Sequence, residues 1–261
     1  MNRFKTGTIT ILSGLLPDRV KRSLFHLSFH LANAEFEKFA HDFAFAPSME
    51  LGLRAMAARG FAPQTIVDVG AFEGDWSRLA KRVWPAASLR MVEPNLEKQA
   101  RLGAVAKDLD AALLCELLGA DDGQQVQFHL MESGSSIMSE RSPLPRTVEQ
   151  RELRRLDSLF PELARPGLLK IDAQGYELEI LKGAGAILPA FEAILVEIAI
   201  IEINVGAPLL HDVVAFMKSL GFIAYDILEI HRRPLDQALN QIDLIFVREQ
   251  SSLVADKRHF A

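Results

Sequence analysis

The most informative segment of this chain is Val67-Asp68-Val69-Gly70-Ala71-Phe72-Glu73-Gly74. An apolar run that begins at Thr65 precedes it, and a helical pattern follows it. A second apolar run, 89–92, ends in the carboxylate of Glu93. A strand, a glycine turn, a helix and a strand ending in a carboxylate form the βαβ unit of nucleotide-binding proteins. The glycines let the backbone approach the ligand, and the carboxylate accepts hydrogen bonds from ribose hydroxyls.

The charge of the glycine turn narrows the choice of ligand. Glu73 and Asp75 flank Gly74, and no Lys or Arg lies inside the turn. The two carboxylates would repel a pyrophosphate at the helix N-terminus, but they would tolerate the sulfonium and ammonium groups of S-adenosylmethionine. We therefore expect S-adenosylmethionine rather than a dinucleotide. The contacts expected from this unit come from Asp68, Gly70, Ala71, Phe72, Gly74, Glu93 and Pro94.

Length and composition are typical of one α/β domain with a large core. The chain has 261 residues, a net charge of −5 and a pI near 5.8, so no basic surface for nucleic acid is expected. Its one cysteine, Cys115, excludes a disulfide framework and fits a reducing compartment, so we expect a cytoplasmic protein. No signal-peptide pattern and no run of ~18 apolar residues is seen, so no membrane span is expected.

The pattern along the chain divides it into three parts. Residues 1–60 read as a helical N-terminal extension, with apolar positions at helical spacing over 20–36 and a second helix over 49–59 that ends at Gly60. Residues 61–250 form the nucleotide-binding domain, and 251–261 form a C-terminal tail. The Phe-rich face of the first helix is expected to pack on its own domain, and the alternatives are contact with a membrane or with a second subunit in a homo-oligomer.

From residue 65 onward, strands and helices alternate as in a doubly wound sheet. The expected strands are 65–70, 88–93, 112–118, 126–130, 168–172, 193–198, 222–228 and 242–247. The expected helices are 75–84, 95–107, 175–187 and 208–220, and the Ser/Pro-rich segment 131–147 is expected to be a loop.

The direction of the last strand distinguishes between classes of protein that share this architecture. The segment between Ile227 and Ile242 contains Pro234 and several polar residues, which leaves little room for the helix of a parallel crossover. An antiparallel return is therefore expected. A final antiparallel strand beside a parallel sheet is the methyltransferase variant, whereas an ordinary nicotinamide dehydrogenase would end on a parallel strand.

Four segments together resemble the FkbM family of S-adenosylmethionine-dependent methyltransferases. They are the stretch 67–74, Glu93-Pro94-Asn95, the loop Ser133-Gly134-Ser135-Ser136, and Leu169-Lys170-Ile171-Asp172-Ala173-Gln174-Gly175-Tyr176-Glu177. The resemblance covers about residues 60–248. It implies a class I methyltransferase fold and O-methylation, often of sugars or polyketide hydroxyls. The chain has Phe72 where the family frequently has Asn, and Gln174 where it often has Glu.

Two further positions near the cofactor have alternative interpretations. Asp68 lies at the end of the first strand, close to the ligand's ammonium group, or it stabilises the loop by accepting backbone N–H bonds. Gly119 and Ala120 follow the third strand, where their backbone N–H and C=O groups would contact the adenine edge. The same segment also reads as an Asp-Gly hairpin turn into the strand 126–130.

Asp172 is the candidate catalytic residue. It ends the fourth strand, at the edge where such sheets bind ligands, and a carboxylate there can orient or deprotonate an acceptor hydroxyl. The alternative is that Asp172 caps the following helix. Lys170 shares its strand face and could pair with a carboxylate. Glu197 with Asp172 gives only two oxygen ligands, so no metal site is predicted.

The acceptor pocket is expected between two loops. Ser135 and Ser136 lie in the long loop, and His231, Arg232 and Arg233 lie between the last two strands. Adjacent arginines suit a carboxylate or phosphate on the acceptor, although a solvated charge cluster explains them as well.

These observations favour an S-adenosylmethionine-dependent O-methyltransferase that acts on a hydroxyl of a glycan, nucleotide sugar or natural product. One alternative is an NAD-type oxidoreductase on the same βαβ start, which the acidic turn disfavours. The other is a non-catalytic nucleotide-binding scaffold, which the intact glycine loop and Asp172 disfavour.

Overall fold

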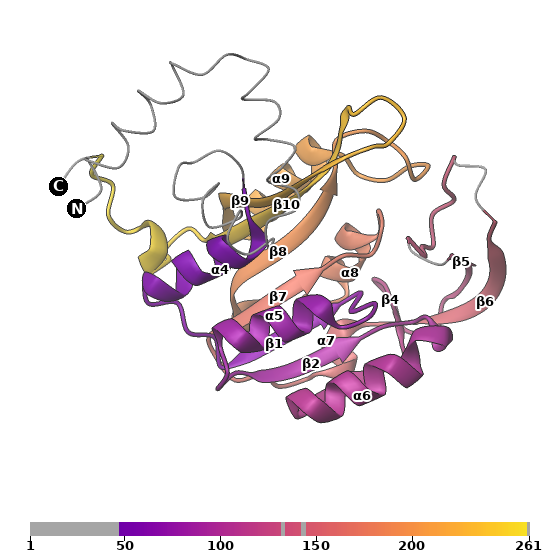
Figure 1. Ribbon diagram of the computed structural model, residues 1–261, viewed down its shortest axis with the longest axis horizontal. Coiled ribbons are helices and arrows are strands. Elements are labelled where there is room, and N and C mark those ends of the chain that lie inside the picture. Colours follow the sequence, from indigo (N-terminus) through magenta and orange to yellow (C-terminus); the bar gives the residue numbers. More distant parts are fainter. Residues whose placement is uncertain (1–46, 132–133, 142–144, 260–261) are drawn as a thin grey trace, which may run out of the picture. The chain divides into compact units, whose positions relative to one another are not determined.

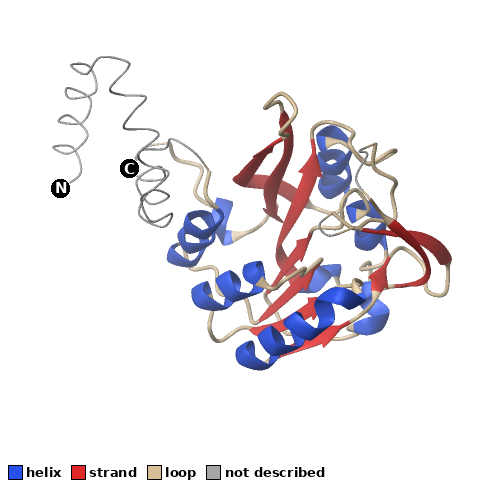
Figure 2. Cartoon of the chain, turned by 45° about the vertical axis from the view of Figure 1, so that its right-hand side comes forward, coloured by secondary structure: helices blue, strands red, loops and turns tan. Residues whose placement is uncertain are grey.

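The computed structural model describes residues 47–131, 134–141 and 145–259 (Figures 1 and 2). The helix expected over 20–36 lies outside these residues. The chain divides into two compact units, Met1–Gly52 and Leu53–Ala261. The helix expected over 49–59 is confirmed as α4, Met49–Ala58, and Gly60 follows it with a φ of 95°. Within the described residues, no helix has the length and apolar character needed to cross a membrane.

The main sheet has seven strands in the order β3-β2-β1-β7-β8-β10-β9. Its strands are β1 (Thr65–Val69), β2 (Ser88–Val92), β3 (Ala111–Leu114), β7 (Gly167–Ile171), β8 (Phe191–Ala199), β9 (Phe222–Arg232) and β10 (Leu239–Arg248). Five of them, β3 to β8 in that order, are parallel. Only β10 runs against its neighbours, because it pairs antiparallel with both β8 and β9. The antiparallel last strand expected from the sequence is therefore confirmed, and the sheet is doubly wound.

A second sheet of three strands, in the order β4-β6-β5, lies beside the first and corrects two expectations. The strand expected over 112–118 is two strands, because β3 ends at Leu114 and β4 (Leu117–Leu118) joins the small sheet. The strand β6 (Thr147–Arg154) was not predicted. It pairs with both β4 and β5 (Gln125–Leu130), so the segment after Leu118 is no hairpin between β4 and β5.

The helices follow the expected order with shorter bounds. The four expected helices are α5 (Asp75–Val83), α6 (Gln99–Leu109) after a 3-10 turn, α8 (Glu177–Lys182) and α9 (Leu210–Ser219). The short helix α7 (Leu156–Leu159) was not predicted. The prediction of a helix over 175–187 was too long. Gly183 ends α8, and a Cβ there would lie 2.0 Å from the Gly119 carbonyl oxygen. Glycine at position 183 lets the end of α8 pack closely against Gly119. Helical periodicity in the sequence does not reveal this requirement.

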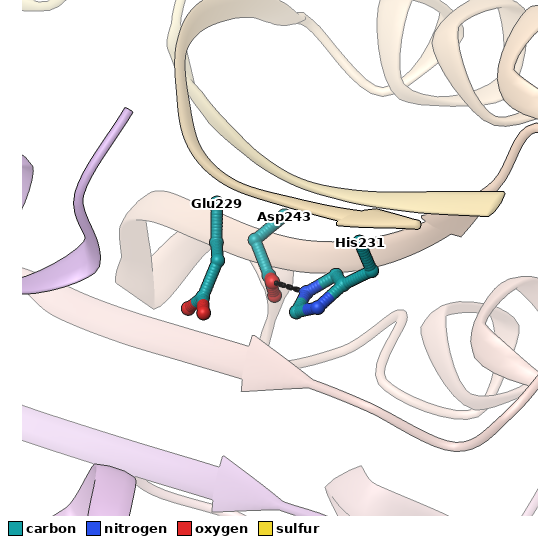
Figure 3. A group of neighbouring side chains, drawn as sticks. All are labelled: Glu229, His231 and Asp243. Carbon is teal, nitrogen blue, oxygen red and sulfur yellow. Dashed lines mark hydrogen bonds and ion pairs between the residues drawn. The ribbon is translucent and has the colours of Figure 1, made fainter. Parts of the chain in front are cut away.

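The two faces of the main sheet differ in polarity near the carboxyl ends of the strands. One face is apolar and packs against α8 and α9, with Val69, Ile171 and Val196 among its buried residues. The opposite face carries charged side chains in neighbouring positions. Glu197 of β8 lies opposite Asp243 of β10, which lies opposite Glu229 of β9. Glu229 and Asp243 point to the same side of their strands, together with His231 (Figure 3).

Candidate functional site

The glycine turn after β1 is built around close approaches that exclude side chains. Gly70 has a φ of 74°, and a Cβ on it would lie 1.9 Å from the Asp172 carbonyl oxygen. Gly74 has a φ of 83°, and its Cβ would lie 2.8 Å from a methyl group of Val105. L-residues with side chains avoid this left-handed region. Glycine is therefore required at both positions, and the turn brings the end of β1 against the end of β7.

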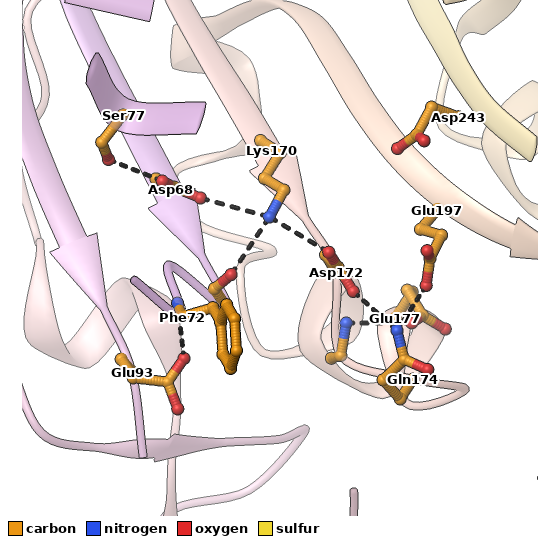
Figure 4. A network of polar contacts seen from close by, with 12 residues as sticks. Asp68, Phe72, Ser77, Glu93, Lys170, Asp172, Gln174, Glu177, Glu197 and Asp243 are labelled. Atoms are coloured by element: carbon orange, nitrogen blue, oxygen red, sulfur yellow. Dashed lines mark hydrogen bonds and ion pairs between the residues drawn. The ribbon is translucent and has the colours of Figure 1, made fainter. Parts of the chain in front are cut away.

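Glu93 is fixed at the end of β2 by two backbone donors. Its Oε2 accepts from the Phe72 N–H at 2.8 Å (Figure 4). Its Oε1 accepts from the Asn95 N–H at 2.9 Å. Burial raises the pKa of Glu93, and the two backbone hydrogen bonds oppose this shift. Each carboxylate oxygen keeps a second lone pair, so Glu93 can still accept from ribose hydroxyls.

Asp68 is fully buried and has partners of its own. Its Oδ2 accepts from the Ser77 hydroxyl at 2.6 Å, and its Oδ1 lies 3.4 Å from Lys170 Nζ. The carboxylate thus ties β1 to α5 and to β7. These side-chain partners differ from the backbone N–H groups that one interpretation assigned to Asp68, whereas its place near a ligand ammonium stays a prediction.

Lys170 is the charged centre of this edge of the sheet. Its ammonium group donates to the Gly70 carbonyl at 3.1 Å and lies 3.3 Å from Asp172 Oδ2 (Figure 4). Burial alone would lower the pKa of Lys170, but Asp172 and Asp68 outweigh it, so the pKa is raised and the group stays charged. The pairing of Lys170 with a carboxylate, expected from the shared strand face, is confirmed. One cation thereby links the glycine turn to Asp172.

Asp172 lies at the carboxyl end of β7 with a partly exposed side chain. The helix-capping alternative is wrong, because α8 begins at Glu177 with Tyr176 at its N-cap. Burial would raise the pKa of Asp172, but Lys170 and the hydrogen bond from Gln174 outweigh it, so the pKa is lowered. Asp172 is therefore ionised at neutral pH and able to accept a hydrogen bond from an acceptor hydroxyl.

A pocket of about 220 Å³ opens between the glycine turn, Glu93 and Asp172. Among the described residues, the predicted site residues that line it are Gly70, Phe72, Glu93, Pro94, Ser135, Ser136 and Asp172. Apolar side chains form much of the rest of the wall, including Leu117, Leu118, Phe128, Ile137 and Ile180. A pocket with apolar walls and a few convergent polar groups is the usual form of a cofactor site.

Other predicted site residues do not line this pocket in the described part of the chain. They are Asp68, Ala71, Gly74, Gly119, Ala120, His231, Arg232 and Arg233. The Gly119 N–H donates to the Arg154 carbonyl at 3.0 Å, so this donor already has a partner within the protein. The Ala120 carbonyl accepts from Arg155 at 3.0 Å. The strand β6, which supplies Arg154, was not foreseen.

The hairpin between β9 and β10 holds its two arginines in local contacts. Arg233 forms a two-pronged ion pair with Asp236, at 2.8 and 2.7 Å, and Arg232 donates to the Gln237 carbonyl at 2.9 Å. His231 Nε2 lies 2.7 Å from Asp243 Oδ2, and this hydrogen bond raises the pKa of His231. With Glu229 these two residues form the one group, within the described residues, whose ligand atoms lie close enough to hold a metal ion.

The acidity of the glycine turn is lower than the sequence indicates. Glu73 lies 3.2 Å from Lys98 Nζ and also pairs with Arg101. Both cations come from the segment after β2, which sequence spacing alone does not place against the turn. The electrostatic argument against a pyrophosphate is therefore weaker, although Asp75 remains exposed beside Gly74. Lys98 also lies 4.2 Å from the centre of the Phe72 ring.

Sequence reasoning assigned no role to three residues at this edge. Gln174 and Gln241 both donate to Glu197 Oε2, at 2.6 and 2.8 Å. Glu177, the buried first residue of α8, accepts from the Ala173 and Gly175 N–H groups of the preceding turn. Burial raises the pKa of Glu177 to about 7, and its backbone hydrogen bonds oppose the shift. The sequence signal that could have identified Glu177 is its position five residues after Asp172, directly after the glycine-containing turn.

The main sheet, with its antiparallel last strand, has the class I methyltransferase architecture. A family model described as a methyltransferase FkbM domain matches residues 68–224, which is more than half of the chain. The chain belongs to this family, as the resemblance in its sequence implies. Among curated protein sequences, none matches this chain.

Several solved structures are similar in fold. The methyltransferase FkbM from Methylobacillus flagellatus KT has 16% identity and a TM-score of 0.46, over 70% of this chain and 44% of its own. Precorrin-6y C5,15-methyltransferase from Geobacter metallireducens GS-15 has 12% identity and a TM-score of 0.43, over 76% and 86%. Magnesium protoporphyrin IX methyltransferase from Synechocystis PCC 6803, solved with bound SAM, has 9% identity and a TM-score of 0.43, over 76% and 77%. The chain therefore spans less than half of the Methylobacillus protein.

Proposed function

We propose that this chain is an S-adenosylmethionine-dependent O-methyltransferase. The observation that carries the proposal is the pocket that joins the glycine turn, the Glu93 carboxylate and Asp172 in one space. Its cofactor, S-adenosylmethionine, supplies the methyl group when bound. Glu93 would hold the ribose hydroxyls, because its two oxygens are already oriented by Phe72 and Asn95.

Asp172 is proposed to orient the acceptor hydroxyl and accept its proton during methyl transfer. Methyl transfer is an in-line displacement, so most of the catalysis consists of holding the acceptor oxygen against the methyl group. Asp172 lines the pocket, and Lys170 and Gln174 fix both of its oxygens. Its low pKa makes it a modest base, which suits a group whose main work is positioning.

The acceptor is proposed to be a hydroxyl of a glycan, a nucleotide sugar or another natural product. Ser135 and Ser136 line the pocket on the side of the long loop and offer hydroxyl groups to such an acceptor. The Ser135 hydroxyl donates to the Met131 carbonyl and accepts from the Met131 N–H, both at 3.0 Å, which fixes its orientation. An anionic acceptor would need Arg232 or Arg233 to leave its contact within the hairpin.

The Asp172→Asn variant tests this assignment. Transfer to a panel of sugars, nucleotide sugars and polyols is measured by release of S-adenosylhomocysteine, first with the wild type and then with the variant. We expect turnover to fall by roughly 10²-fold or more, because Asn cannot accept a proton. The affinity for S-adenosylhomocysteine should change by less than about threefold. Full turnover in Asp172→Asn would remove Asp172 from the reaction.

A further inference from the structure

The side-chain amide of Gln174 lies between two carboxylates. Its Nε2 lies 3.0 Å from Asp172 Oδ1 and 2.6 Å from Glu197 Oε2 (Figure 4). An amide nitrogen has two N–H donors, so one side chain can satisfy both acceptors. The two acceptors also fix the orientation of the Gln174 amide, because a flipped amide would point its carbonyl oxygen at both of them.

The backbone holds Gln174 in place from both sides. Its φ of 52° lies in the left-handed region, which residues with a side chain rarely adopt. The Ser136 hydroxyl donates to the Gln174 carbonyl at 2.8 Å. Glu177 accepts from the N–H groups on either side, at 3.1 Å from Ala173 and 2.9 Å from Gly175. Ser136 and Glu177 thus fix the backbone at Gln174 from two sides.

The two carboxylates need such a donor because negative charges are crowded on this face. Glu197 lies directly opposite Asp243 on the neighbouring strand, and like charges in that arrangement repel. Burial raises the pKa of Glu197 well above its ordinary value, and Asp172 and Asp243 raise it further. Gln241 adds a second amide donor to the same Glu197 oxygen. The neutral amide of Gln174 satisfies oxygens of both side chains without adding a further negative charge to this face.

We propose that Gln174 is a positioning residue for methyl transfer, because its neutral amide bridges Asp172 and Glu197 and aims the Asp172 carboxylate into the acceptor pocket. The effect of Gln174 on methyl transfer rests on the proposed function. The hydrogen-bonded bridge between Asp172 and Glu197 does not depend on that function. The amide supplies two hydrogen-bond donors. Without them, a cation would be needed to hold the two acidic side chains together. A carboxylate at position 174 would instead bring three acids together and create a demand for a proton or a metal ion.

Two variants separate charge from hydrogen bonding at this position. Gln174→Met keeps the length of the side chain and removes both donors without adding charge. Gln174→Glu keeps the shape and adds a negative charge. The matched controls are Gln237→Met and Gln237→Glu, since Gln237 also has a left-handed φ, 61°, and is exposed in the β9–β10 hairpin. Any effect of backbone conformation alone should therefore appear in both pairs.

The first measurement uses no acceptor. Melting temperatures are recorded at pH 5.5 and 8.0, with and without MnCl₂, and S-adenosylhomocysteine binding is measured by calorimetry. We expect Gln174→Glu to melt about 3–6 °C below the wild type at pH 8.0 and closer to it at pH 5.5, because protonation removes the added charge. MnCl₂ should raise its melting temperature selectively. Gln174→Met should show a loss independent of pH and of MnCl₂. Equal pH profiles for Gln174→Glu and Gln237→Glu would overturn the bridge.

The second measurement tests positioning, with S-adenosylmethionine and the acceptor found in the panel described above. We expect Gln174→Met to lower kcat by roughly tenfold or more while the KM for S-adenosylmethionine stays within about threefold. A merely structural residue would leave kcat of the folded fraction unchanged, and that result would overturn the positioning role. If wild-type protein binds no S-adenosylhomocysteine, the proposed function fails, yet the melting profiles still decide whether Gln174 bridges the two acids.

Discussion

At the scale of single residues, the structure shows charges held by specific partners. Asp172 was identifiable from sequence, because a carboxylate at the end of a parallel strand lies at the ligand edge. Its partners were not all identifiable. Gln174 donates to Glu197, which is 23 positions away in the chain, and only the sheet order brings them together. The same limit applies to Glu73, whose neutralisation by Lys98 depends on how two segments fold against each other.

Glu177 gives the sharpest prediction at this scale. Its folded pKa is about 7 against an ordinary value of 4.5, and burial is the main cause. The folded state therefore binds this proton more tightly than the unfolded chain. The stabilisation is complete below about pH 4.5 and is lost as the pH rises toward 7. Over that window the wild type should lose roughly 3 kcal/mol of unfolding free energy relative to Glu177→Gln.

Urea denaturation of both proteins at pH 5, 6, 7 and 8 measures this difference. The Gln side chain still accepts from the Ala173 and Gly175 N–H groups, so the turn should keep its shape. Because other acids titrate equally in both proteins, only the difference between the curves is informative. Two parallel curves would show that the pKa of Glu177 is ordinary in the folded protein.

At the scale of secondary-structure elements, periodicity predicted most of the main sheet and little of the small one. The strands β1, β2, β7 and β10 are marked by apolar runs, and the short segment before β10 correctly indicated an antiparallel return. The strand β6 reads Thr-Val-Glu-Gln-Arg-Glu-Leu-Arg and has mostly exposed or partly exposed side chains. A strand without a buried apolar face gives no hydrophobic pattern, so sequence could not separate it from the preceding loop.

The glycine turn and the end of β7 form one unit, and Gly70→Ala tests it. The new Cβ would lie 1.9 Å from the Asp172 carbonyl oxygen, in a backbone conformation that alanine disfavours. We expect a loss of about 2–4 kcal/mol in unfolding free energy and a weaker affinity for S-adenosylhomocysteine.

Gly123→Ala is the matched control for this change. Gly123 has a φ of 82°, and no atom lies within 4 Å of the Cβ it would gain. Alanine there should cost only the conformational term, about 1 kcal/mol, with ligand binding unchanged. If denaturation gave the two variants the same loss, the contact between the turn and β7 would contribute nothing.

At the scale of the whole molecule, the alternation of strands and helices was enough to predict the class of fold. The family match over residues 68–224 agrees with the resemblance in the sequence. The pocket could be predicted only in part, because several segments far apart in the chain form its walls. Glycine spacing marks the turn and Glu93, whereas the small sheet contributes apolar wall residues such as Phe128 that no motif indicates.

The most direct test of the central claim is calorimetric titration of the wild type and Glu93→Ala with S-adenosylhomocysteine and with NAD. We predict that the wild type binds S-adenosylhomocysteine and does not bind NAD. Glu93→Ala should weaken S-adenosylhomocysteine binding by about 1–3 kcal/mol, which is roughly 5- to 150-fold, because a charged hydrogen-bond acceptor is lost. Binding of NAD without binding of S-adenosylhomocysteine, or an affinity that Glu93→Ala leaves unchanged, would contradict the account.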